Sequence, residues 1–303
     1  MRRPVDAVML AQRAASFTKR SIKAESKRAG LRLAVSMVDL TTLEGADSPE
    51  LVRALCRRAI SPCPTPLDPP VPSVAAVCIY PRLVPIVREA LAGSSVRVAS
   101  VATGFPSGQA PLEMRLQDTQ AAIEAGADEI DMVISRGAFL AGRFDEVADE
   151  VRAVQEVCGD AHLKVILETG ELETPDNIRR CADLVIDAAS RDRAVQDGEV
   201  FVKTSTGKMS PAATMPSVLL LLESVRDHFN ATGVRIGVKP AGGIRRAKAA
   251  LHLLVMVRET VGQDWLTPDL FRIGASSLLD DLVRQLLWTS RGCYAAMHDV
   301  AVT

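Results

Sequence analysis

The sequence predicts an α/β protein, a (β/α)8 TIM barrel with a helical extension at its N-terminus. Three observations support this fold. Eight short runs rich in Val and Ile alternate with helical stretches along the chain, as strands and helices do in such a barrel. The first run ends without the glycine-rich phosphate turn that a doubly wound open sheet normally carries. The glycine-rich turns instead follow the last three runs, where barrels build phosphate sites.

The eight expected strands are short and apolar on both faces, as buried parallel strands are. They are Leu33–Val38, Val74–Ile79, Val96–Ala102, Glu129–Ile134, His162–Leu167, Glu199–Thr204, Arg235–Lys239 and Leu270–Ile273. A chain of 303 residues with 48% hydrophobic content can bury one large core. We therefore expect a single barrel domain over residues 33–303 and a basic helical extension over residues 1–32.

The basic composition of this extension could be mistaken for that of a transit peptide. Asp6 and Glu25, however, break the acid-poor pattern of such targeting signals. We therefore expect a solvated amphipathic helix. Its apolar side would carry Val8, Leu10, Ala14, Ala15 and Phe17.

Helices are expected in the gaps between the strands. Ser48-Pro49 and Thr174-Pro175 each combine an N-cap residue with proline at the first helical position. Apolar residues at helical spacing predict further helices within residues 111–126, 146–158, 212–229 and 244–261. Six prolines within residues 61–72 exclude a helix there, so we expect an irregular surface excursion.

The composition argues against several classes of function. A net charge of -1 and an aromatic content of 4% argue against a nucleic-acid or membrane-surface partner. The sequence has no run of about 18 apolar residues, so we expect no transmembrane helix. The six cysteines form no CxxC pair, and the four histidines lie in separate segments. We therefore expect no metal site and a reducing, cytoplasmic location.

Polar side chains in or just after the expected strands are the candidate functional residues, because catalytic groups of barrels stand at the carboxyl ends of strands. These side chains are Asp39, Thr41, Asp131, Lys164, Lys203 and Lys239. Burying three ammonium groups with only the carboxylate of Asp131 opposite them would cost folding free energy, which argues against a purely structural role. Either Asp131 satisfies an ion network between Lys164 and Lys239, or one amine loses its proton beside a second ammonium and attacks a carbonyl. For Lys203 and Lys239 we favour the reaction of an amine with a carbonyl over the ion network. For Lys164 the ion network and a supporting electrostatic role are equally open.

Three turns after the sixth, seventh and eighth strands suit a phosphate group. Ser205–Lys208 offers backbone N–H groups and a cation. Ala241–Gly243 leads into a helix expected from Ile244, whose N-terminus would favour an anion. Gly274–Ser277 offers hydroxyl groups before another helix. Together the three turns predict a phosphorylated substrate.

Seven segments of the chain resemble motifs of the deoxyribose-phosphate aldolase family. They are Asp39–Leu43, Ala76–Pro81, Val98–Pro106, Lys164–Leu172, Lys203–Lys208, Lys239–Gly243 and Arg272–Ser277. The length of the chain and its tail, Gly292–Asp299, are more similar to the longer, animal-type branch than to the short bacterial one. The resemblance implies a class I aldolase of deoxyribonucleotide catabolism that needs no cofactor. It would cleave 2-deoxy-D-ribose 5-phosphate reversibly into acetaldehyde and glyceraldehyde 3-phosphate through a lysine Schiff base.

The resemblance also implies roles for individual residues. Lys203 would be the Schiff-base lysine, Lys239 would lower the pKa of Lys203 and assist proton transfer, and Asp131 would help Lys239 to position a proton-shuttling water. The phosphate would be held by the turns that contain Gly207, Lys208, Gly242, Gly243, Ser276 and Ser277. The pocket near the sugar hydroxyls would be lined by Asp39, Thr41 and Thr206.

Several questions stay open at the level of sequence. A phosphosugar isomerase or another lyase could use the same phosphate site, and a catalytically silent barrel could bind phosphorylated sugars as a scaffold. A homo-oligomer is compatible with the sequence, although the apolar stripe Leu251–Val257 is expected in the core rather than at an interface. The bacterial branch ends in a mobile tyrosine tail that this chain lacks, and whether Tyr294 replaces it is open.

Overall fold

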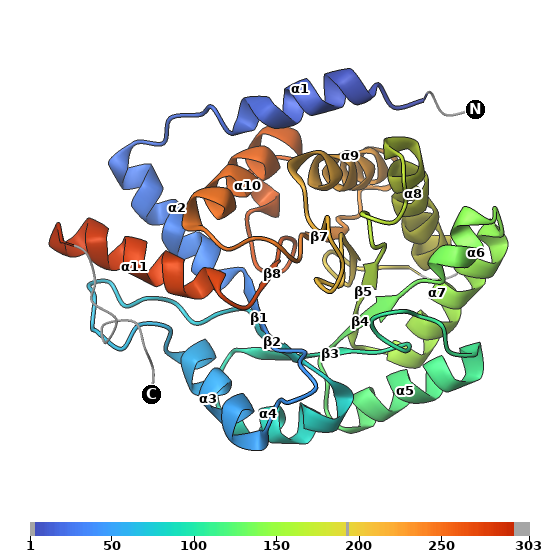
Figure 1. The fold of residues 1–303 in the computed structure, drawn as a ribbon, viewed down its shortest axis with the longest axis horizontal. Coiled ribbons are helices and arrows are strands. Elements are labelled where there is room, and N and C mark those ends of the chain that lie inside the picture. The colour runs from blue at the N-terminus through green and yellow to red at the C-terminus, as the bar shows by residue number, and fades with distance from the viewer. Residues whose placement is uncertain (1–3, 192–193, 294–303) are drawn as a thin grey trace.

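The computed structural model describes residues 4–191 and 194–293 of the chain. Within these residues, eight parallel strands form a barrel that helices surround (Figure 1). The predicted (β/α)8 TIM barrel is confirmed. The predictions about the tail, including the role of Tyr294, lie outside the described residues.

The strands follow one another around the barrel in sequence order. They are β1 (Val38–Thr41), β2 (Ala76–Ile79), β3 (Arg97–Val101), β4 (Glu129–Val133), β5 (His162–Ile166), β6 (Val200–Lys203), β7 (Gly237–Lys239) and β8 (Ile273–Ala275). The sheet runs β7-β6-β5-β4-β3-β2-β1-β8, and bridges of Val238 with Phe271 and of Ala241 with Gly274 join its two ends. Because the sheet is nearly closed, the carboxyl ends of all eight strands surround one mouth.

The helices lie outside the strands (Figure 1). They are α1 (Ala7–Phe17), α2 (Ala24–Ser36), α3 (Pro49–Ile60), α4 (Val84–Ala90), α5 (Leu112–Glu124), α6 (Arg136–Leu140), α7 (Phe144–Cys158), α8 (Pro175–Arg191), α9 (Met215–Thr232), α10 (Ala247–Thr260) and α11 (Leu278–Arg291), with short 3₁₀ helices at Pro81–Leu83 and Gln263–Trp265. Ser48 Oγ accepts a hydrogen bond from the Leu51 N–H, and Thr174 Oγ1 accepts one from the Asn177 N–H, so both predicted N-caps are confirmed. No helix of the described residues is long and apolar enough to cross a bilayer.

The expected first strand, Leu33–Val38, is wrong. Helix α2 continues to Ser36, and β1 begins only at Val38. Leu31 and Val35 are buried one turn apart, and α2 packs against α10 and α11. The apolar run that suggested a strand is therefore the inner face of a helix, followed directly by the strand.

Two boundaries late in the chain also differ from the prediction. The first two residues of the expected strand Leu270–Ile273 donate their N–H groups to the carbonyl oxygen of Thr267, so they finish a turn before β8. The helix expected from Ile244 begins at Ala247, after a cap at Arg246. In both places the apolar pattern does not show where regular hydrogen bonding begins.

The N-terminal extension forms two helices instead of one solvated helix. Helix α1 lies along α9 and α10 (Figure 1) and buries Leu10, Ala14 and Phe17. Val8 and Ala15 are exposed, so the expected apolar side is wrong for these two residues. The buried residues follow the i, i+4, i+7 spacing that lines one face of a helix. The division between residues 1–32 and 33–303 stays a prediction, and α2 runs across it.

Residues 61–72 contain no helix, as their prolines predict. Arg28 Nη2 donates to the carbonyl oxygen of Asp68 at 2.8 Å, and Arg32 Nη1 donates to that of Pro69 at 2.9 Å. Two arginines of α2 thus hold this excursion against the barrel. The apolar residues of the stripe Leu251–Val257 in α10 belong to the hydrophobic core or pack against it, as expected.

Candidate active site

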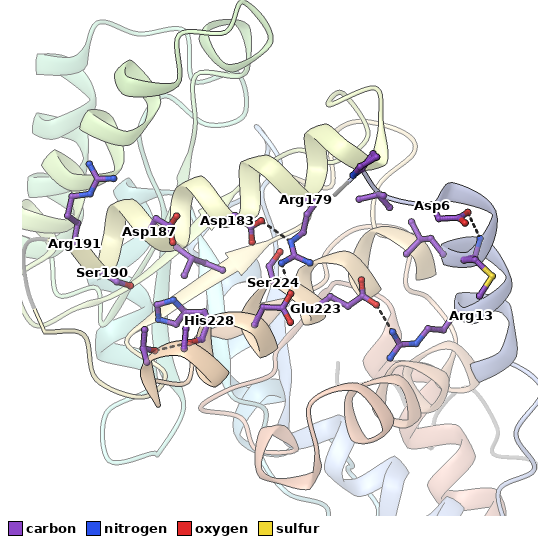
Figure 2. Close-up of a pocket in the computed structure, with 18 residues that line it drawn as sticks. Asp6, Arg13, Arg179, Asp183, Asp187, Ser190, Arg191, Glu223, Ser224 and His228 are labelled. Atoms are coloured by element: carbon purple, nitrogen blue, oxygen red, sulfur yellow. Dashed lines mark hydrogen bonds and ion pairs between the residues drawn. The ribbon is translucent and has the colours of Figure 1, made fainter. Parts of the chain in front are cut away.

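Two regions of the described structure gather polar side chains. The first is a surface cavity of about 980 Å³ between α1, α8 and α9 (Figure 2). Arg13 of α1 pairs there with Glu223 of α9, and Arg179 of α8 pairs with Asp227 of α9, so these two ion pairs connect neighbouring helices. Arg179 also pairs with Asp183 on its own helix. The second region is the barrel lumen, where side chains from several strands meet away from water. Reactive chemistry is favoured in the lumen, because burial perturbs the protonation of the groups there.

The three lysines of the lumen come from neighbouring strands. Lys164 lies in β5, and Lys203 and Lys239 end β6 and β7. Lys203 and Lys239 are direct partners in the parallel ladder, and neighbouring strands lie about 4.8 Å apart. All three side chains are buried, with at most 3% exposed. The adjacency of Lys203 and Lys239 predicted from the sequence is confirmed.

Asp131 of β4 connects the three lysines. Its Oδ2 accepts hydrogen bonds from Lys203 Nζ and Lys239 Nζ, each at 2.7 Å, and its Oδ1 accepts one from Lys164 Nζ at 3.1 Å. Burial alone would raise the pKa of Asp131, but the three ammonium groups reverse this and hold the pKa well below its ordinary value. The ion network with Asp131 between Lys164 and Lys239 is therefore present, and Lys203 takes part in it.

Lys203 and Lys239 differ in the direction of their pKa shifts. Burial lowers the pKa of Lys203, Asp131 opposes this, and the charge of Lys239 lowers it further, so the result lies below the ordinary value. Burial also acts to lower the pKa of Lys239, but Asp131 and Asp39 outweigh it and raise the pKa above the ordinary value. Lys203 is consequently the amine that more readily loses its proton, a choice that the sequence pattern could not make.

The lumen contains two charged residues that the sequence analysis did not include, Glu129 and Arg272. Arg272 Nη1 donates to Asp39 Oδ1 at 2.6 Å, and Arg272 Nη2 donates to Glu129 Oε1 at 2.7 Å. Lys164 Nζ also donates to Glu129. Burial would raise the pKa of Glu129, but Arg272 and Lys164 lower it below its ordinary value. The expectation that three ammonium groups face only Asp131 is therefore wrong.

Strand periodicity could have revealed Glu129. It precedes Asp131 by two positions in β4, and residues two apart in a strand point to the same face. Arg272 is a polar residue inside the expected strand Leu270–Ile273, so its position could also have marked it. Its partners could not be predicted, because Asp39 and Glu129 are 233 and 143 residues away. Asp39 itself is fully buried and pairs with Lys239 at 2.6 Å, so it joins the ion cluster of the lumen.

The expected phosphate turns adjoin one another at the mouth of the barrel. Gly207 and Gly242 approach closely, since a Cβ on Gly242 would lie 2.9 Å from Gly207 Cα. Both glycines have positive φ angles, as does Gly243. Gly274 hydrogen-bonds the turn after β7, which brings the exposed Ser276 and Ser277 to the same side. Ser277 caps α11, so this turn opens onto a helix N-terminus as predicted.

Two threonines and Lys208 lie at the rim of this mouth. Thr41 Oγ1 donates to the carbonyl oxygen of Asp39 at 2.9 Å, and Lys208 Nζ donates to Glu44 Oε1 at 2.8 Å. Thr206 donates its hydroxyl and its N–H to Glu168, another buried residue that the sequence analysis did not include. Glu168 has a φ of 54°, an uncommon conformation for a non-glycine residue.

Glu168 connects the loops around the mouth. Arg136, at the start of α6, lies 3.6 Å from Glu168 and donates to the carbonyl oxygens of Pro106 and Ser107 in the loop after β3. Glu168 in turn holds Thr206 in the loop after β6. The first of the three expected phosphate turns is thus connected to the loops after β3 and β5.

The arrangement as a whole suits proton transfer around a nucleophilic amine. An amine with a lowered pKa lies within hydrogen-bond distance of a carboxylate, which a permanent ammonium also contacts. Such an amine can attack a carbonyl, and its neighbours can move the protons that the reaction requires. No group of three or more His, Cys, Asp or Glu side chains within residues 4–191 and 194–293 is placed to hold a metal ion.

Comparisons with known proteins agree with this chemistry. The DeoC/LacD family of aldolases matches residues 33–283. A deoxyribose-phosphate aldolase from Mus musculus is 46% identical over 293 residues, covering 94% of this chain and 89% of the relative. A crystal structure from Toxoplasma gondii superposes with a TM-score of 0.73 at 23% identity, covering 89% of this chain and 98% of the other. A deoxyribose phosphate aldolase from Aeropyrum pernix, described as a unique tetramer, has a TM-score of 0.60 at 27% identity and covers 92% of this chain and 97% of its own.

Proposed function

This chain belongs to the DeoC/LacD family of aldolases, and we infer that it is a class I deoxyribose-phosphate aldolase that works through a Schiff base on Lys203. Its reaction is the reversible cleavage of 2-deoxy-D-ribose 5-phosphate into acetaldehyde and D-glyceraldehyde 3-phosphate. The observation that carries the inference is a buried amine with a lowered pKa, 2.7 Å from Asp131 and beside the ammonium of Lys239.

The chemistry starts with attack of the neutral Lys203 amine on the aldehyde carbon of the open-chain sugar. Loss of water leaves an iminium ion, which accepts electrons when the bond between C2 and C3 breaks. The C3 hydroxyl loses its proton as this carbon becomes the aldehyde of glyceraldehyde 3-phosphate. The two-carbon enamine that remains on Lys203 is protonated and hydrolysed to acetaldehyde, which returns the free amine.

Asp131 and Lys239 are proposed to serve the proton transfers. The carboxylate of Asp131 contacts both amines, so it can receive or deliver a proton through a water at either stage. Lys239 keeps its proton, because Asp131 and Asp39 raise its pKa, and its charge disfavours a second ammonium on Lys203. Lys164 supports this arrangement by holding the other oxygen of Asp131.

The phosphate is proposed to bind at the three adjoining turns after β6, β7 and β8. Backbone N–H groups of Gly207 and Gly243, the hydroxyls of Ser276 and Ser277, and the ammonium of Lys208 supply donors of the kind that phosphates bind. The N–H of Gly242 donates to Gly274, so Gly242 would serve the site by allowing the turns to approach. Thr41 and Thr206 would face the sugar hydroxyls at the rim. Anchoring the phosphate would orient the reacting carbons over Lys203.

Borohydride trapping tests this proposal. Incubation with 2-deoxyribose 5-phosphate and borohydride is expected to add a reduced adduct to Lys203, which peptide mass mapping would locate. Lys203→Ala is expected to abolish turnover and the adduct while circular dichroism shows a retained fold. Lys208→Ala is the matched control, since it should weaken binding of the phosphorylated sugar but keep the adduct at saturating substrate. Turnover without any adduct on Lys203 would instead favour an isomerase or another lyase at this site.

Further properties follow as proposals from the same relatives and residues. The A. pernix relative is tetrameric, which supports a homo-oligomer for this chain and can be checked by sedimentation. Three buried, free cysteines, Cys56, Cys78 and Cys181, support a reducing cytoplasmic location. In that setting the enzyme would remove deoxyribose phosphate in the catabolism of deoxyribonucleotides.

A further inference from the structure

The lumen of the barrel holds more cationic than anionic side chains. Among the described residues that meet there, the cations are Lys164, Lys203, Lys239 and Arg272, and the carboxylates are Asp39, Glu129 and Asp131. Each is at most 3% exposed. If all seven were ionised, an uncompensated positive charge would lie in a medium of low polarity, which is strongly unfavourable. One lysine without a proton removes that charge.

The contacts identify Lys203 as this lysine. In the described lumen, Lys203 Nζ pairs with one carboxylate, Asp131, whose Oδ2 it shares with Lys239. Lys239 pairs with Asp39 as well, at 2.6 Å. Lys164 lies within 4.0 Å of three carboxylates, including Glu129. The ammonium form of Lys203 is therefore the least stabilised by carboxylates. In agreement, the lowering of its pKa by burial outweighs the opposing effect of Asp131.

Arg272 is the cation that cannot give up its proton. A guanidinium stays charged at any pH that a protein survives, and Asp39 and Glu129 stabilise its charge further. It takes two of the three carboxylates, with Nη1 2.6 Å from Asp39 and Nη2 2.7 Å from Glu129. Asp131 is then the one carboxylate of the described lumen that Arg272 does not contact, and it is the carboxylate with which Lys203 pairs.

We propose that Arg272, through Glu129 and Asp39, is a positioning residue that sets the charge balance of the lumen and thereby leaves Lys203 without a proton. Lys239 favours the neutral form of Lys203 through one neighbouring positive charge. Arg272 supplies the positive charge by which the cations of the cluster outnumber its carboxylates. The inference rests on the proposed role of Lys203, and it assigns to Arg272 and Glu129 a part in the reaction although neither reaches the substrate.

Groups at the amino-terminal end of the barrel do not change this balance. Arg97 lies 3.4 Å from Glu129, but its side chain is one-third exposed and also pairs with Asp269 at 3.2 Å. Burial, together with the charge of Arg97, lowers the pKa of His162, so this ring is neutral at pH 7. The amino-terminal end of the barrel therefore adds the ion pair of Arg97 with Asp269 and no net charge to the lumen.

Groups at the mouth and around Lys203 are also balanced. Cys78 of β2 lies beside Asp131, and burial raises the pKa of its thiol to about 11, so it is uncharged at pH 7. Glu168 faces Arg136 at 3.6 Å, and Arg136 also pairs at 2.8 Å with Glu171, whose side chain is 35% exposed and therefore screened by water. The excess of positive charge therefore belongs to the seven lumen residues.

Charge-changing substitutions test the proposal, because they should shift Lys203 in opposite directions. Arg272→Gln removes a cation and is expected to raise the pH at which Lys203 loses its proton by about one unit, because loss of a buried like charge favours the ammonium form. Glu129→Gln removes an anion and is expected to lower that pH by a similar amount. The double variant R272Q/E129Q removes both charges and is expected to return it close to the wild-type value.

The readout is reductive methylation of Lys203 with formaldehyde and cyanoborohydride, followed by peptide mass mapping as a function of pH. It reports the neutral amine whether or not the protein cleaves deoxyribose 5-phosphate, so its failure is distinct from failure of the proposed function. The ascending limb of kcat/KM against pH should move in parallel. Arg179→Gln, which removes an arginine from the α8–α9 surface, is the control and should leave Lys203 unchanged.

Shifts in the same direction for both single variants, or folded variants without any shift, would overturn the proposal. Circular dichroism and a cooperative thermal transition establish folding. If a single variant does not fold, Arg272→Met replaces Arg272→Gln and Glu129→Met replaces Glu129→Gln. The same opposite shifts are then required, because each replacement changes the lumen charge in the same sense as the variant that it replaces.

Discussion

At the scale of single residues, two lysines of the same strand-end pattern have opposite properties. Lys203 and Lys239 are both buried and contact the same oxygen of Asp131. Lys239 additionally meets Asp39, and this second carboxylate decides that it stays protonated. The residue type and the strand position are shared, so the difference is entirely one of surroundings. Identical side chains can therefore supply the proposed nucleophile and its proposed charged neighbour.

Lys239→Met tests this division of roles. Neutral Lys203 is the reactive form, so kcat/KM should rise with pH as Lys203 loses its proton. Removing the ammonium of Lys239 takes away a like charge and leaves Asp131 to stabilise the Lys203 ammonium, and both effects raise the pKa of Lys203. We expect the ascending limb of the pH profile to move up by about one unit or more. At neutral pH, kcat/KM should fall by roughly 10²- to 10⁴-fold, because proton transfer is also impaired.

Lys208→Met provides the control for that profile. Its ammonium lies at the rim beside Glu44, so its loss should raise KM and leave the limb where it is. A limb that stays in place or moves to lower pH in Lys239→Met would contradict the assignment of Lys239 as the charged neighbour.

At the scale of structural elements, the turn after β7 requires glycine for a steric reason. Gly242 has a φ of 81°, and a Cβ there would lie 2.9 Å from Gly207 Cα and 2.7 Å from Ala212 Cβ. A Cβ on Gly207 would lie 3.7 Å from Gly242 Cα, which is an ordinary contact. The turns after β6 and β7 can therefore approach because Gly242 has no side chain at the contact.

Gly242→Ala is expected to move these turns apart and to raise KM for the phosphorylated sugar by roughly 10- to 100-fold. Gly233→Ala is the matched control, because Gly233 ends α9 with a φ of 77° and has no atom within 4 Å of its Cβ position. Both substitutions should cost stability by about 1 kcal/mol or more through the positive φ angle. Steady-state kinetics should separate them, and an equal KM in both variants would argue against the phosphate site.

At the scale of the whole molecule, the N-terminal helix is part of the packed structure and lies far from the chemistry. Helix α1 packs against α9 and α10, and it buries Phe17 to 3% exposure. Arg13 and Arg20 add ion pairs to Glu223 of α9 and Glu259 of α10. The basic character of this segment is thus used in contacts with acidic residues on the outside of the barrel.

Phe17→Ala should lower the free energy of unfolding by about 3 kcal/mol, since it leaves a cavity under α1. Val8→Ala, on the same helix but 66% exposed, should change it by less than about 0.5 kcal/mol. Urea unfolding measures both, and kcat/KM at 25 °C should match the wild type in each. A loss of activity in folded Phe17→Ala would show that α1 influences the lumen.

The sequence by itself determined the barrel and most of the residues that face its mouth. Apolar runs, helix N-caps and polar residues at strand ends are all patterns of residues that are close in the sequence, so they can be read without the structure. For this reason Lys203, Lys239 and Asp131 could be placed together in advance, and so could the glycine turns. The predicted start of β1 was wrong because an apolar run fits the inner face of a helix as well as a buried strand. Only the packing of α2 on α10 and α11 distinguishes the helix from the strand.

The spacing of the two lysines left open which of them more readily loses its proton. The resemblance to the family implied Lys203, and only the tertiary structure supplies the physical reason. That choice depends on the sum of charges from β1, β4, β5 and β7 and from Arg272, which lie far apart in the sequence and meet only in the lumen. Glu129 and Arg272 are 143 residues apart, and their contact leaves no local signature. Coulomb interactions act through space, so a pKa belongs to the folded arrangement, whereas the periodicity of a strand belongs to the chain.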